Sequence, residues 1–440
     1  MNLKSFKERY FRHFSWSIVL PVLFLLIIGL ITLYSTTILP EGGVGSLSIV
    51  KKQVISIIVG IFAFIIFSYI NISYLKHWQF VLIIYLVTVG LLVATLLFAP
   101  TIANVKRWLT IAGFQLQPSE IAKLCVIITT SVTLSYKEKY NEFLLFVITL
   151  ILISPIVILI YMQPSGSIMI LTLVIWFIIV FFGLNNPLRN SMILVIISSI
   201  TLSLLMSAIT GNNMWYLLLG VAIIPAVFGF YSKNNWQQFM IASLLIGIFL
   251  GIFAQVVWKN ILKDYQKKRI EAFLSPEETK TDIGFNVNQA RIAIGSGQIL
   301  GKGFGNGTQS KRNFLPEYQT DFIFASFAEE FGLIGSIFLI GVYCWLIIIC
   351  LLTAVKTANN TMLSLISAGL GVKLLLEVFV NIGTNMGTIP ATGIPLPLMS
   401  AGGTSVIITM VGFGILQNIY ICSTNKLRTE KKDILKVYED

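Results

Sequence analysis

The stretch SWSIVLPVLFLLIIGLITLYS, residues 15–35, decides the fold class of this chain. It carries no charged residue, and a helix needs about 20 consecutive, mostly apolar residues to cross the hydrocarbon core of a bilayer. The run is long for a signal peptide, and no small-residue cleavage site follows it. We therefore expect it to be retained in the protein as a first membrane span.

Similar apolar runs recur along the chain and predict about twelve membrane-spanning helices. They cover residues 16–36, 53–72, 79–98, 119–135, 142–161, 167–184, 190–208, 213–231, 237–258, 331–354, 361–381 and 402–421. The composition is 56% hydrophobic and 11% charged, whereas about a quarter of the residues of a soluble domain are charged. The predicted fold is therefore all-α, a polytopic membrane helix bundle that forms one domain over residues 1–440. A transmembrane barrel would instead alternate with a period of two residues.

The distribution of lysine and arginine predicts the orientation of the chain. With the N-terminus inside the cell, the cytoplasmic tails and short loops hold fifteen basic residues, and the short outer loops hold Lys51, Lys52, Lys106 and Arg107. Basic residues prefer the cytoplasmic side, so residues 1–15 and 422–440 are predicted cytoplasmic tails and residues 259–330 a large extracellular loop. The net charge of +12 then reflects topology, and no nucleic-acid partner is expected.

The segment from Trp258 to Gly332 is a polar island in this apolar chain, and it is where we expect chemistry. Asp282 lies there among basic residues, where it could act as a general base, bind a divalent cation or be a solvated loop side chain. The glycine-rich run at residues 293–307 matches no phosphate-loop fingerprint, although its amides could bind phosphate oxygens. Asp321 is expected to start the helix that leads into the next span, as its N-cap residue. Glu329-Glu330 lies at the membrane edge, where basic partners or a cation would be needed.

Two pairs of opposite charge have helical spacing. Glu120 and Lys123 lie three residues apart in the first turn of a predicted helix, where they can form an internal ion pair. The alternative for this segment is that Lys106 and Arg107 hold an anionic group at the outer headgroup level, with Trp108 as an interfacial anchor. Lys373 and Glu377 lie four residues apart within a span, and intramembrane charges pair with one another or face a cavity. Lys373 and Glu377 could therefore form a structural ion pair or line a path for the substrate.

Residues 381–403 contain no charge but hold Pro390, Pro395 and Pro397, so they cannot form a continuous helix. Non-helical backbone at membrane depth is tolerated only inside protein or beside a cavity. We expect a re-entrant or surface-skimming loop here, with an ordinary outer connector as the alternative.

Several motifs in this order resemble the SEDS family (shape, elongation, division and sporulation), and its elongation branch more than its division branch. The motifs are Lys106-Arg-Trp108, Gln117-Pro-Ser-Glu-Ile-Ala-Lys123, Gln163-Pro164, Ala293-Ile-Gly-Ser-Gly297, Gly301-Lys-Gly-Phe-Gly305, Gly307-Thr-Gln309, Phe314-Leu-Pro-Glu317, Thr320-Asp-Phe-Ile-Phe324, Glu329-Glu330 and Thr392-Gly-Ile-Pro-Leu-Pro-Leu-Met-Ser400. The resemblance implies a peptidoglycan glycosyltransferase that polymerises lipid II on the outer face of the bacterial cytoplasmic membrane. It also implies a class B penicillin-binding protein as partner, besides the membrane lipids.

The resemblance further implies an essential aspartate before the Ala-Ile-Gly-Ser-Gly motif, which makes Asp282 the leading catalytic candidate and Glu278 the fallback. Ungapped counting back from Gln289 would place the family's aspartate at Thr279, so the assignment to Asp282 assumes a shift of three residues. The family has ten spans, and the extra pair predicted here falls between the sixth and ninth. Ser165 stands where the family commonly has an acid.

In the implied reaction, Asp282 accepts the proton of an acceptor sugar hydroxyl, directly or by way of a divalent cation such as Mg²⁺ or Mn²⁺. Basic residues would stabilise the departing pyrophosphate. The candidate substrate-binding residues are Lys106, Arg107, Glu120, Lys123, Arg269, Gln289, Lys302, Gln309, Glu317, Asp321, Glu329, Glu330, Pro395 and Ser400. A lipid II flippase and a non-catalytic scaffold for cell-wall synthesis are the alternatives.

Overall fold

The computed structural model describes residues 14–38, 43, 45–101, 106–111, 114–184, 269, 273, 283–311 and 317–439. Nearly all of them belong to one compact unit, which lies within residues 1–183 and 286–440. The predicted spans at 190–208, 213–231 and 237–258 lie outside the described residues, as do Asp282 and Glu278.

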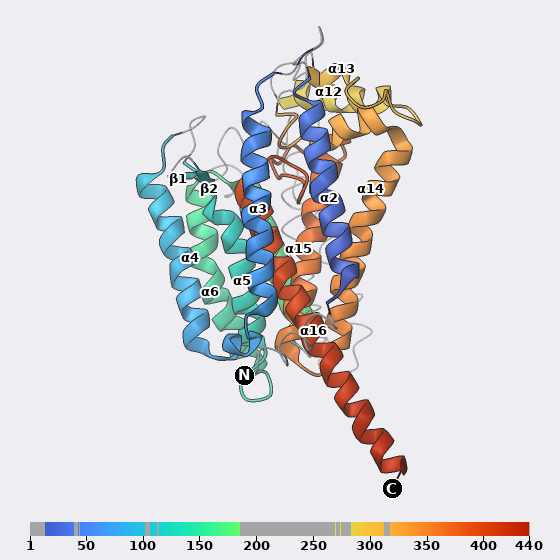
Figure 1. Ribbon diagram of the computed structural model, residues 1–440. Coiled ribbons are helices and arrows are strands. Elements are labelled where there is room, and N and C mark those ends of the chain that lie inside the picture. The colour runs from blue at the N-terminus through green and yellow to red at the C-terminus, as the bar shows by residue number, and fades with distance from the viewer. Residues whose placement is uncertain are drawn as a thin grey trace, which may run out of the picture. The chain divides into compact units, whose positions relative to one another are not determined.

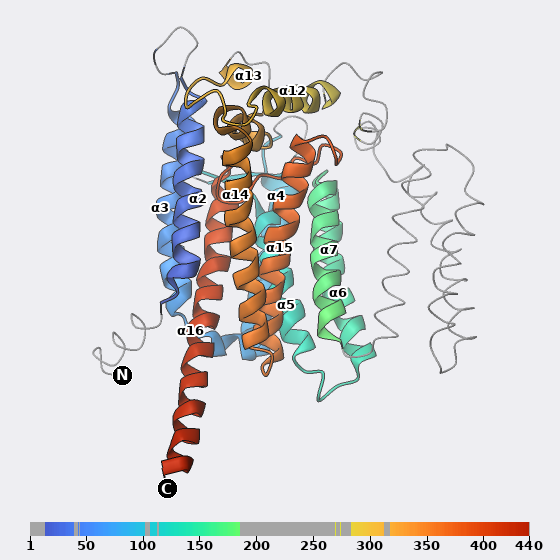
Figure 2. The same cartoon turned by 90° about the vertical axis from the view of Figure 1, so that its right-hand side faces the viewer.

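Apolar helices build the unit (Figures 1 and 2). They are α2 (Trp16–Ser35), α3 (Ser48–Tyr69), α4 (Trp78–Phe98), α5 (Pro118–Leu134), α6 (Glu142–Met162), α7 (Gly166–Gly183), α14 (Ile323–Lys356), α15 (Thr361–Asn385) and α16 (Gly403–Glu439). Within the described residues, eight helices are long and apolar enough to cross a membrane, and α5 is slightly shorter at 17 residues. Each helix matches one predicted span, so the all-α, polytopic class is confirmed, while a total of twelve stays a prediction.

Local sequence signals set several helix ends. Pro118 occupies the first turn of α5 and Glu120 follows in the same turn, where the helix dipole favours an acid. The side chain of Asn360 caps α15 by accepting a hydrogen bond from the Leu363 N–H at 3.3 Å. A short 3₁₀ helix, η1 (Ile72–Lys76), joins α3 to α4.

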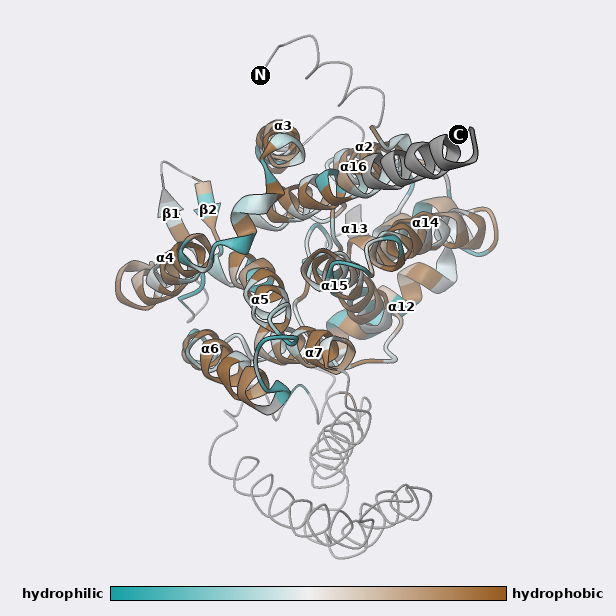
Figure 3. Ribbon diagram, turned by 90° about the horizontal axis from the view of Figure 1, so that it is seen from below, coloured by the Kyte–Doolittle hydropathy of each residue, from teal (hydrophilic) through white to brown (hydrophobic). Residues whose placement is uncertain are grey.

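The helices differ in how far neighbouring protein covers them. In the most apolar 18-residue segment of α3, α4 and α6, only 28% of the residues are buried by neighbouring protein. The corresponding share is 61% for α15 and 78% for α16. Figure 3, a view along the helices, shows the predominantly hydrophobic colouring of the peripheral helices. The buried faces of α5, α15 and α16 are thus the ones that can hold polar side chains away from lipid.

The two ends of the unit carry different structures. The short helices α12 (Ile283–Ser296) and α13 (Thr308–Lys311) cover one end, while the start of α2 and the end of α16 lie at the other (Figures 1 and 2). Strands β1 (Leu109–Ile111) and β2 (Phe114–Leu116) form an antiparallel hairpin in which Leu109 faces Leu116. The Thr404 hydroxyl, in the first turn of α16, donates to the Gln115 carbonyl at 2.9 Å and fixes this hairpin.

Candidate functional site

Helix α14 is broken at Gly332, where the backbone takes φ 66° and ψ −164°. The break divides α14 into an upper part before Gly332 and a lower part after it, called here its upper and lower halves. The first N–H groups of the lower half are left without helical acceptors. The glycine-rich turn after α12 supplies replacements, since the Leu333 N–H donates to the Gln298 carbonyl at 2.9 Å and the Ile334 N–H to the Ile299 carbonyl at 3.2 Å. The turn therefore caps the lower half of α14.

The same turn also caps the upper half of α14. The backbone N–H groups of Lys302 and Gly303 donate to the carbonyls of Glu329 and Glu330, both at 3.0 Å. The approach is so close that a Cβ at Gly301 would lie 2.1 Å from the Glu330 carbonyl oxygen. The glycines of this motif are thus required because backbone must pack directly on the break in α14.

The carboxylate of Glu329 is fully buried and lies at the centre of a cluster of donors. Its Oε1 accepts from the Lys302 Nζ at 2.6 Å, the Thr308 N–H at 2.8 Å and the Thr308 hydroxyl at 2.7 Å. The Gln309 N–H lies 3.2 Å from Oε2, and the Ser296 hydroxyl 3.4 Å from Oε1. The expectation that Glu329 needs a basic partner is confirmed, and that partner is Lys302.

Glu330 points elsewhere, toward α2. The Ser35 hydroxyl donates a short hydrogen bond to the buried Glu330 carboxylate and accepts one from the Gly305 N–H at 3.1 Å. Adjacent carboxylates are thereby kept apart and each is given its own donors. The glycine-rich turn is in this way attached to α2 as well as to α14.

Residues 386–402, between α15 and α16, form a non-helical loop that enters the bundle. The Tyr343 hydroxyl of α14 donates to the Pro397 carbonyl at 2.6 Å, and Tyr343 lies about 16 Å along the helix from Gly332 at 1.5 Å per residue. A Cβ at Gly29 of α2 would lie 2.8 Å from the Met399 Cα. The prediction of a re-entrant loop in this region is confirmed.

Two asparagines of α15 hold this loop against the start of α14. The Asn381 amide donates to the carbonyls of Asp321 and Ile394 at 2.9 and 2.8 Å. The Asn385 amide donates to the same Asp321 carbonyl at 2.9 Å, and its oxygen accepts from the Ala325 N–H at 3.0 Å. The expected N-cap role of Asp321 is wrong, because α14 begins at Ile323 and Phe322 is its N-cap residue. Asp321 instead contributes its backbone carbonyl, which accepts from both asparagines.

Ser400 joins the loop to two further segments. Its hydroxyl donates to the Thr320 carbonyl at 2.5 Å and accepts from the Leu396 N–H at 2.8 Å. The Gln53 side chain of α3 donates to the Ser400 carbonyl at 3.0 Å and accepts from the Gly402 N–H at 3.3 Å. The loop therefore has a fixed backbone, and Ser400 is a positioning residue within it.

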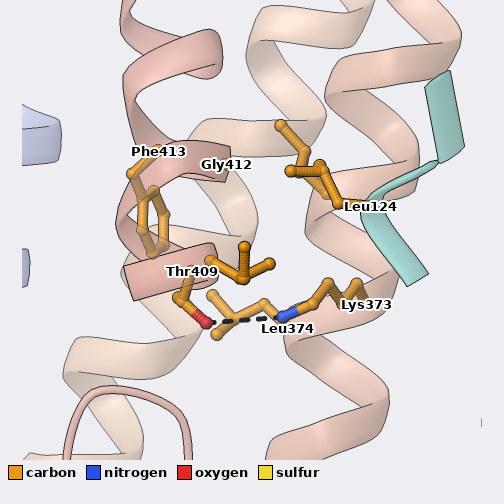
Figure 4. A pocket seen from close by; sticks show the side chains of 8 residues that line it. Leu124, Lys373, Leu374, Thr409, Gly412 and Phe413 are labelled. Carbon is orange, nitrogen blue, oxygen red and sulfur yellow. Dashed lines mark hydrogen bonds between the residues drawn. The ribbon is translucent and has the colours of Figure 1, made fainter. Parts of the chain in front are cut away.

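A chain of alternating charges lies in the core between α5, α15 and α16. Lys123 Nζ contacts Glu120 Oε1 at 2.7 Å and Glu377 Oε1 at 2.5 Å, and Lys373 Nζ contacts Glu377 Oε2 at 2.8 Å. Lys373 Nζ also lies 3.4 Å from the Thr409 hydroxyl (Figure 4). Both predicted pairs are confirmed, and they form one network with two positive and two negative groups.

An apolar pocket borders this network at Lys373, as Figure 4 shows. Its other lining residues are Leu124, Leu370, Leu374, Ile408, Thr409, Gly412 and Phe413. The Lys373 ammonium is bonded within the protein, so the pocket presents mainly hydrocarbon. Structural pairing accounts for the contacts of all four charges, and a substrate path along them stays a prediction.

The basic motif near the β-hairpin is tied to the turn between α6 and α7. Arg107 donates from Nε to the Gln163 carbonyl at 3.3 Å and from Nη2 to the Pro164 carbonyl. The Gln163 amide donates in turn to the Leu92 carbonyl of α4 at 3.0 Å. Lys106 is partly exposed beside it. Two motifs that are distant in sequence thus meet, and their role toward an anionic group stays a prediction.

The remaining predicted residues are spread over the α12 end of the unit. Gln289 is partly exposed on α12, Glu317 is exposed, and Pro395 is partly exposed in the re-entrant loop. Arg269 belongs to the other unit of the chain, so its relation to this end stays a prediction. Direct contacts therefore join Lys302, Gln309 and Glu329 in one group and Glu120 and Lys123 in a second, deeper group.

Sequence reasoning missed the polar side chains that hold these groups in place. They are Ser35, Gln53, Asn381, Asn385 and Tyr343. Each lies within or at the end of an apolar span, and a polar side chain in such a place is a usable signal because it needs a partner. Its partner, however, is distant in sequence.

Among the described residues, no group of three or more His, Cys, Asp or Glu side chains is placed to hold a metal ion. The Glu329 carboxylate is already surrounded by protein donors.

The fold and the site define a polytopic membrane protein whose covered end combines a capped broken helix with a re-entrant loop. The chain belongs to the SEDS family of cell cycle proteins, since the family model for FtsW, RodA and SpoVE matches residues 15–218 and 216–425.

Curated relatives and solved structures are similar over nearly the whole chain. The peptidoglycan glycosyltransferase MrdB of Escherichia coli (strain K12) is 30% identical over 91% of this chain and 93% of its own length. The peptidoglycan glycosyltransferase RodA of Treponema pallidum is 29% identical over 92% of this chain and 97% of its own.

A chain of a peptidoglycan synthase complex, solved in a study of coordinated polymerization and crosslinking, has a TM-score of 0.66 at 21% identity and covers 93% of this chain and 98% of its own. The rod shape determining protein RodA of Thermus thermophilus has a TM-score of 0.57 at 19% identity, with 92% and 96% covered. At these identities the structural similarity concerns the fold.

Proposed function

We propose that this protein is a peptidoglycan glycosyltransferase that polymerises lipid II on the outer face of the bacterial cytoplasmic membrane during cell elongation. The observation that carries the proposal is the near full-length similarity to MrdB and RodA, which are both named as peptidoglycan glycosyltransferases. The family model matches residues 216–425, a range that includes the broken helix, the glycine-rich turn and the re-entrant loop.

In the proposed reaction, a hydroxyl of the acceptor sugar attacks the anomeric carbon of a second lipid-linked molecule. A new C–O bond forms, the bond from that carbon to pyrophosphate breaks, and undecaprenyl pyrophosphate leaves with the electron pair. Asp282 accepts the proton of the attacking hydroxyl. General-base help of this kind is worth about 10²–10⁴ in rate.

The position of Asp282 in the chain supports its role. Helix α12 begins at Ile283, directly after Asp282, and its far end continues into the turn that caps α14 at Gly332. The aspartate therefore directly precedes, in sequence, a helix whose other end is held to α14 by backbone hydrogen bonds.

Basic groups near this end would stabilise the departing pyrophosphate electrostatically. Lys302 has a side chain that is 27% exposed although its ammonium contacts Glu329, so it retains access to a ligand. Arg107 and Arg269 are further candidates, and a divalent cation, Mg²⁺ or Mn²⁺, would supply the same stabilisation when held by Asp282 and the phosphates.

The proposed topology places both termini in the cytoplasm and α12 outside. The distribution of basic residues supports it, and so does the position of α12 at the end opposite the start of α2 and the end of α16 (Figure 2). A class B penicillin-binding protein is the proposed partner, because a structurally similar chain comes from a synthase complex that couples polymerization to crosslinking.

Purified protein with its partner, given labelled lipid II in proteoliposomes, tests the proposal. We expect the wild-type protein, with its partner present, to give glycan strands on a gel. We expect an Asp282→Asn protein under the same conditions to give none. Transfer of lipid II between leaflets without polymer formation would favour a flippase instead. A complex that forms and supports crosslinking, yet yields no polymer from any preparation, would favour a scaffold.

A further inference from the structure

The turn between α12 and α14 exposes large apolar side chains outside the predicted spans. Ile299 is 62% exposed and Leu300 is 78% exposed, and the nearby Ile292 and Phe304 are 44% and 47% exposed. Single exposed apolar side chains are ordinary on a protein surface, but a contiguous exposed apolar patch marks a site of contact with a membrane or another protein. The exposure of Ile299, Leu300 and their neighbours calls for an apolar surface that covers them.

The backbone contacts of this turn fix its depth relative to α14. Ile299 accepts the hydrogen bond from the Ile334 N–H at 3.2 Å, and Leu300 follows directly. Leu333 and Ile334, the first residues below the break, are 54% and 57% exposed on a helix that crosses the membrane. The exposed surface continues downward along α14 at Ile337 (61%) and Phe338 (60%), as a lipid-facing surface does.

We propose that Ile299 and Leu300 are inserted into the outer leaflet, at the boundary between headgroups and acyl chains. The occupant of this apolar surface is lipid, because the surface is continuous with the lipid-facing side of α14. Apolar side chains of surface-bound elements reach about 5–10 Å into this boundary. The turn is thus an anchor as well as a cap for the broken helix.

The anchor would set the height of the neighbouring charged group. Lys302 follows Leu300 by two residues, and its ammonium lies 2.6 Å from Glu329. An inserted turn therefore keeps Lys302 at headgroup level, where the pyrophosphate of a lipid-linked substrate lies. This consequence rests on the proposed function, whereas the insertion itself does not.

The test uses a nitroxide label on Leu300→Cys in full-length protein, reconstituted without partner in phospholipid nanodiscs, with Cys125, Cys344, Cys350 and Cys422 replaced by Ala. Its collision rates with oxygen and with a water-soluble nickel chelate are compared with those of two controls. Phe338→Cys reports hydrocarbon, and Asn306→Cys, an exposed polar position in the same loop, reports water.

We expect the label at Leu300 to favour oxygen over nickel, as the label at Phe338 does and the label at Asn306 does not. Accessibility to nickel equal to that of Asn306 would overturn the proposal. Protection from both reagents would also overturn it, because a protein surface would then cover the turn.

A photoreactive benzoylphenylalanine at Leu300 in the otherwise native chain gives a second readout. Phospholipid adducts are expected, and adducts to protein alone would contradict the proposal.

Discussion

Glu329 is the residue on which the glycine-rich loop converges. Its carboxylate accepts from one ammonium, one hydroxyl and two backbone amides within 3.2 Å while it is fully buried. An amide cluster of this kind can bind phosphate oxygens, but here an internal carboxylate takes that place. The amides of Thr308 and Gln309 therefore stabilise the protein at this point.

The Glu329→Gln substitution keeps the shape of the side chain and removes its charge. Hydrogen bonds to a charged group contribute about 1.5–3 kcal/mol each, so we expect destabilisation of at least this size. Thermal unfolding in detergent should show a lower Tm, with loss of polymerase activity. Glu317→Gln, at an exposed acid of the same loop, should leave the Tm unchanged. Equal Tm values for the two variants would contradict the role assigned to Glu329.

At the scale of elements, α14 works as two helices that share one cap. A break inside a span is costly because backbone groups lose their partners. Here the turn at residues 298–303 supplies two carbonyls and two amides to the broken ends. The break allows the upper part of α14 to hold the loop while the lower part lies in the membrane.

Gly332→Ala tests this arrangement. The backbone of Gly332, with φ 66° and ψ −164°, lies in a region that is essentially restricted to glycine and costs another residue about 1–3 kcal/mol. A Cβ here would also lie 2.3 Å from the Gly301 nitrogen. We therefore expect a lower Tm and loss of activity. Gly341→Ala in the same helix, where a Cβ meets nothing within 4 Å, should keep the Tm or raise it, since alanine favours helix. If both variants behave alike, the cap does not depend on Gly332.

The sequence was sufficient for features that depend on local spacing. Apolar runs located every span that falls on described residues, and helical periodicity found the Glu120–Lys123 and Lys373–Glu377 pairs. It did not show that Lys123 joins the two pairs through Glu377, because 254 residues separate the partners. The same limit hid the contacts of Gln53 and Tyr343. The glycine-rich run is visible in the sequence, but its role as the cap of a broken helix is not.

Within the whole unit, the charge network joins α5 and α15, two helices that are far apart in sequence, and contacts α16 at Thr409. It is neutral overall, and Glu377 lies at its centre with one ammonium on each oxygen. A buried ion pair is poor evidence for net stabilisation, but removal of one member leaves an uncompensated charge. The network therefore penalises any separation of α5 from α15 more strongly than apolar contacts alone would.

Glu377→Gln should destabilise the protein strongly, by about 3–5 kcal/mol, because it leaves two ammonium groups for one carboxylate. The double variant Lys373→Met with Glu377→Gln retains the neutral Glu120–Lys123 pair. We expect its Tm to lie above that of Glu377→Gln alone. Independent, additive losses in the two substitutions would show that the four charges do not act as a network.

We propose above that this membrane protein polymerises glycan strands with Asp282 as the general base. The most direct measurement is the single-turnover rate of glycan bond formation by Asp282→Asn and Glu278→Gln proteins, each with partner and labelled lipid II. We expect a rate about 10²–10⁴ lower for Asp282→Asn and a nearly normal rate for Glu278→Gln, with both proteins folded and partner-bound. A normal rate for Asp282→Asn would contradict it.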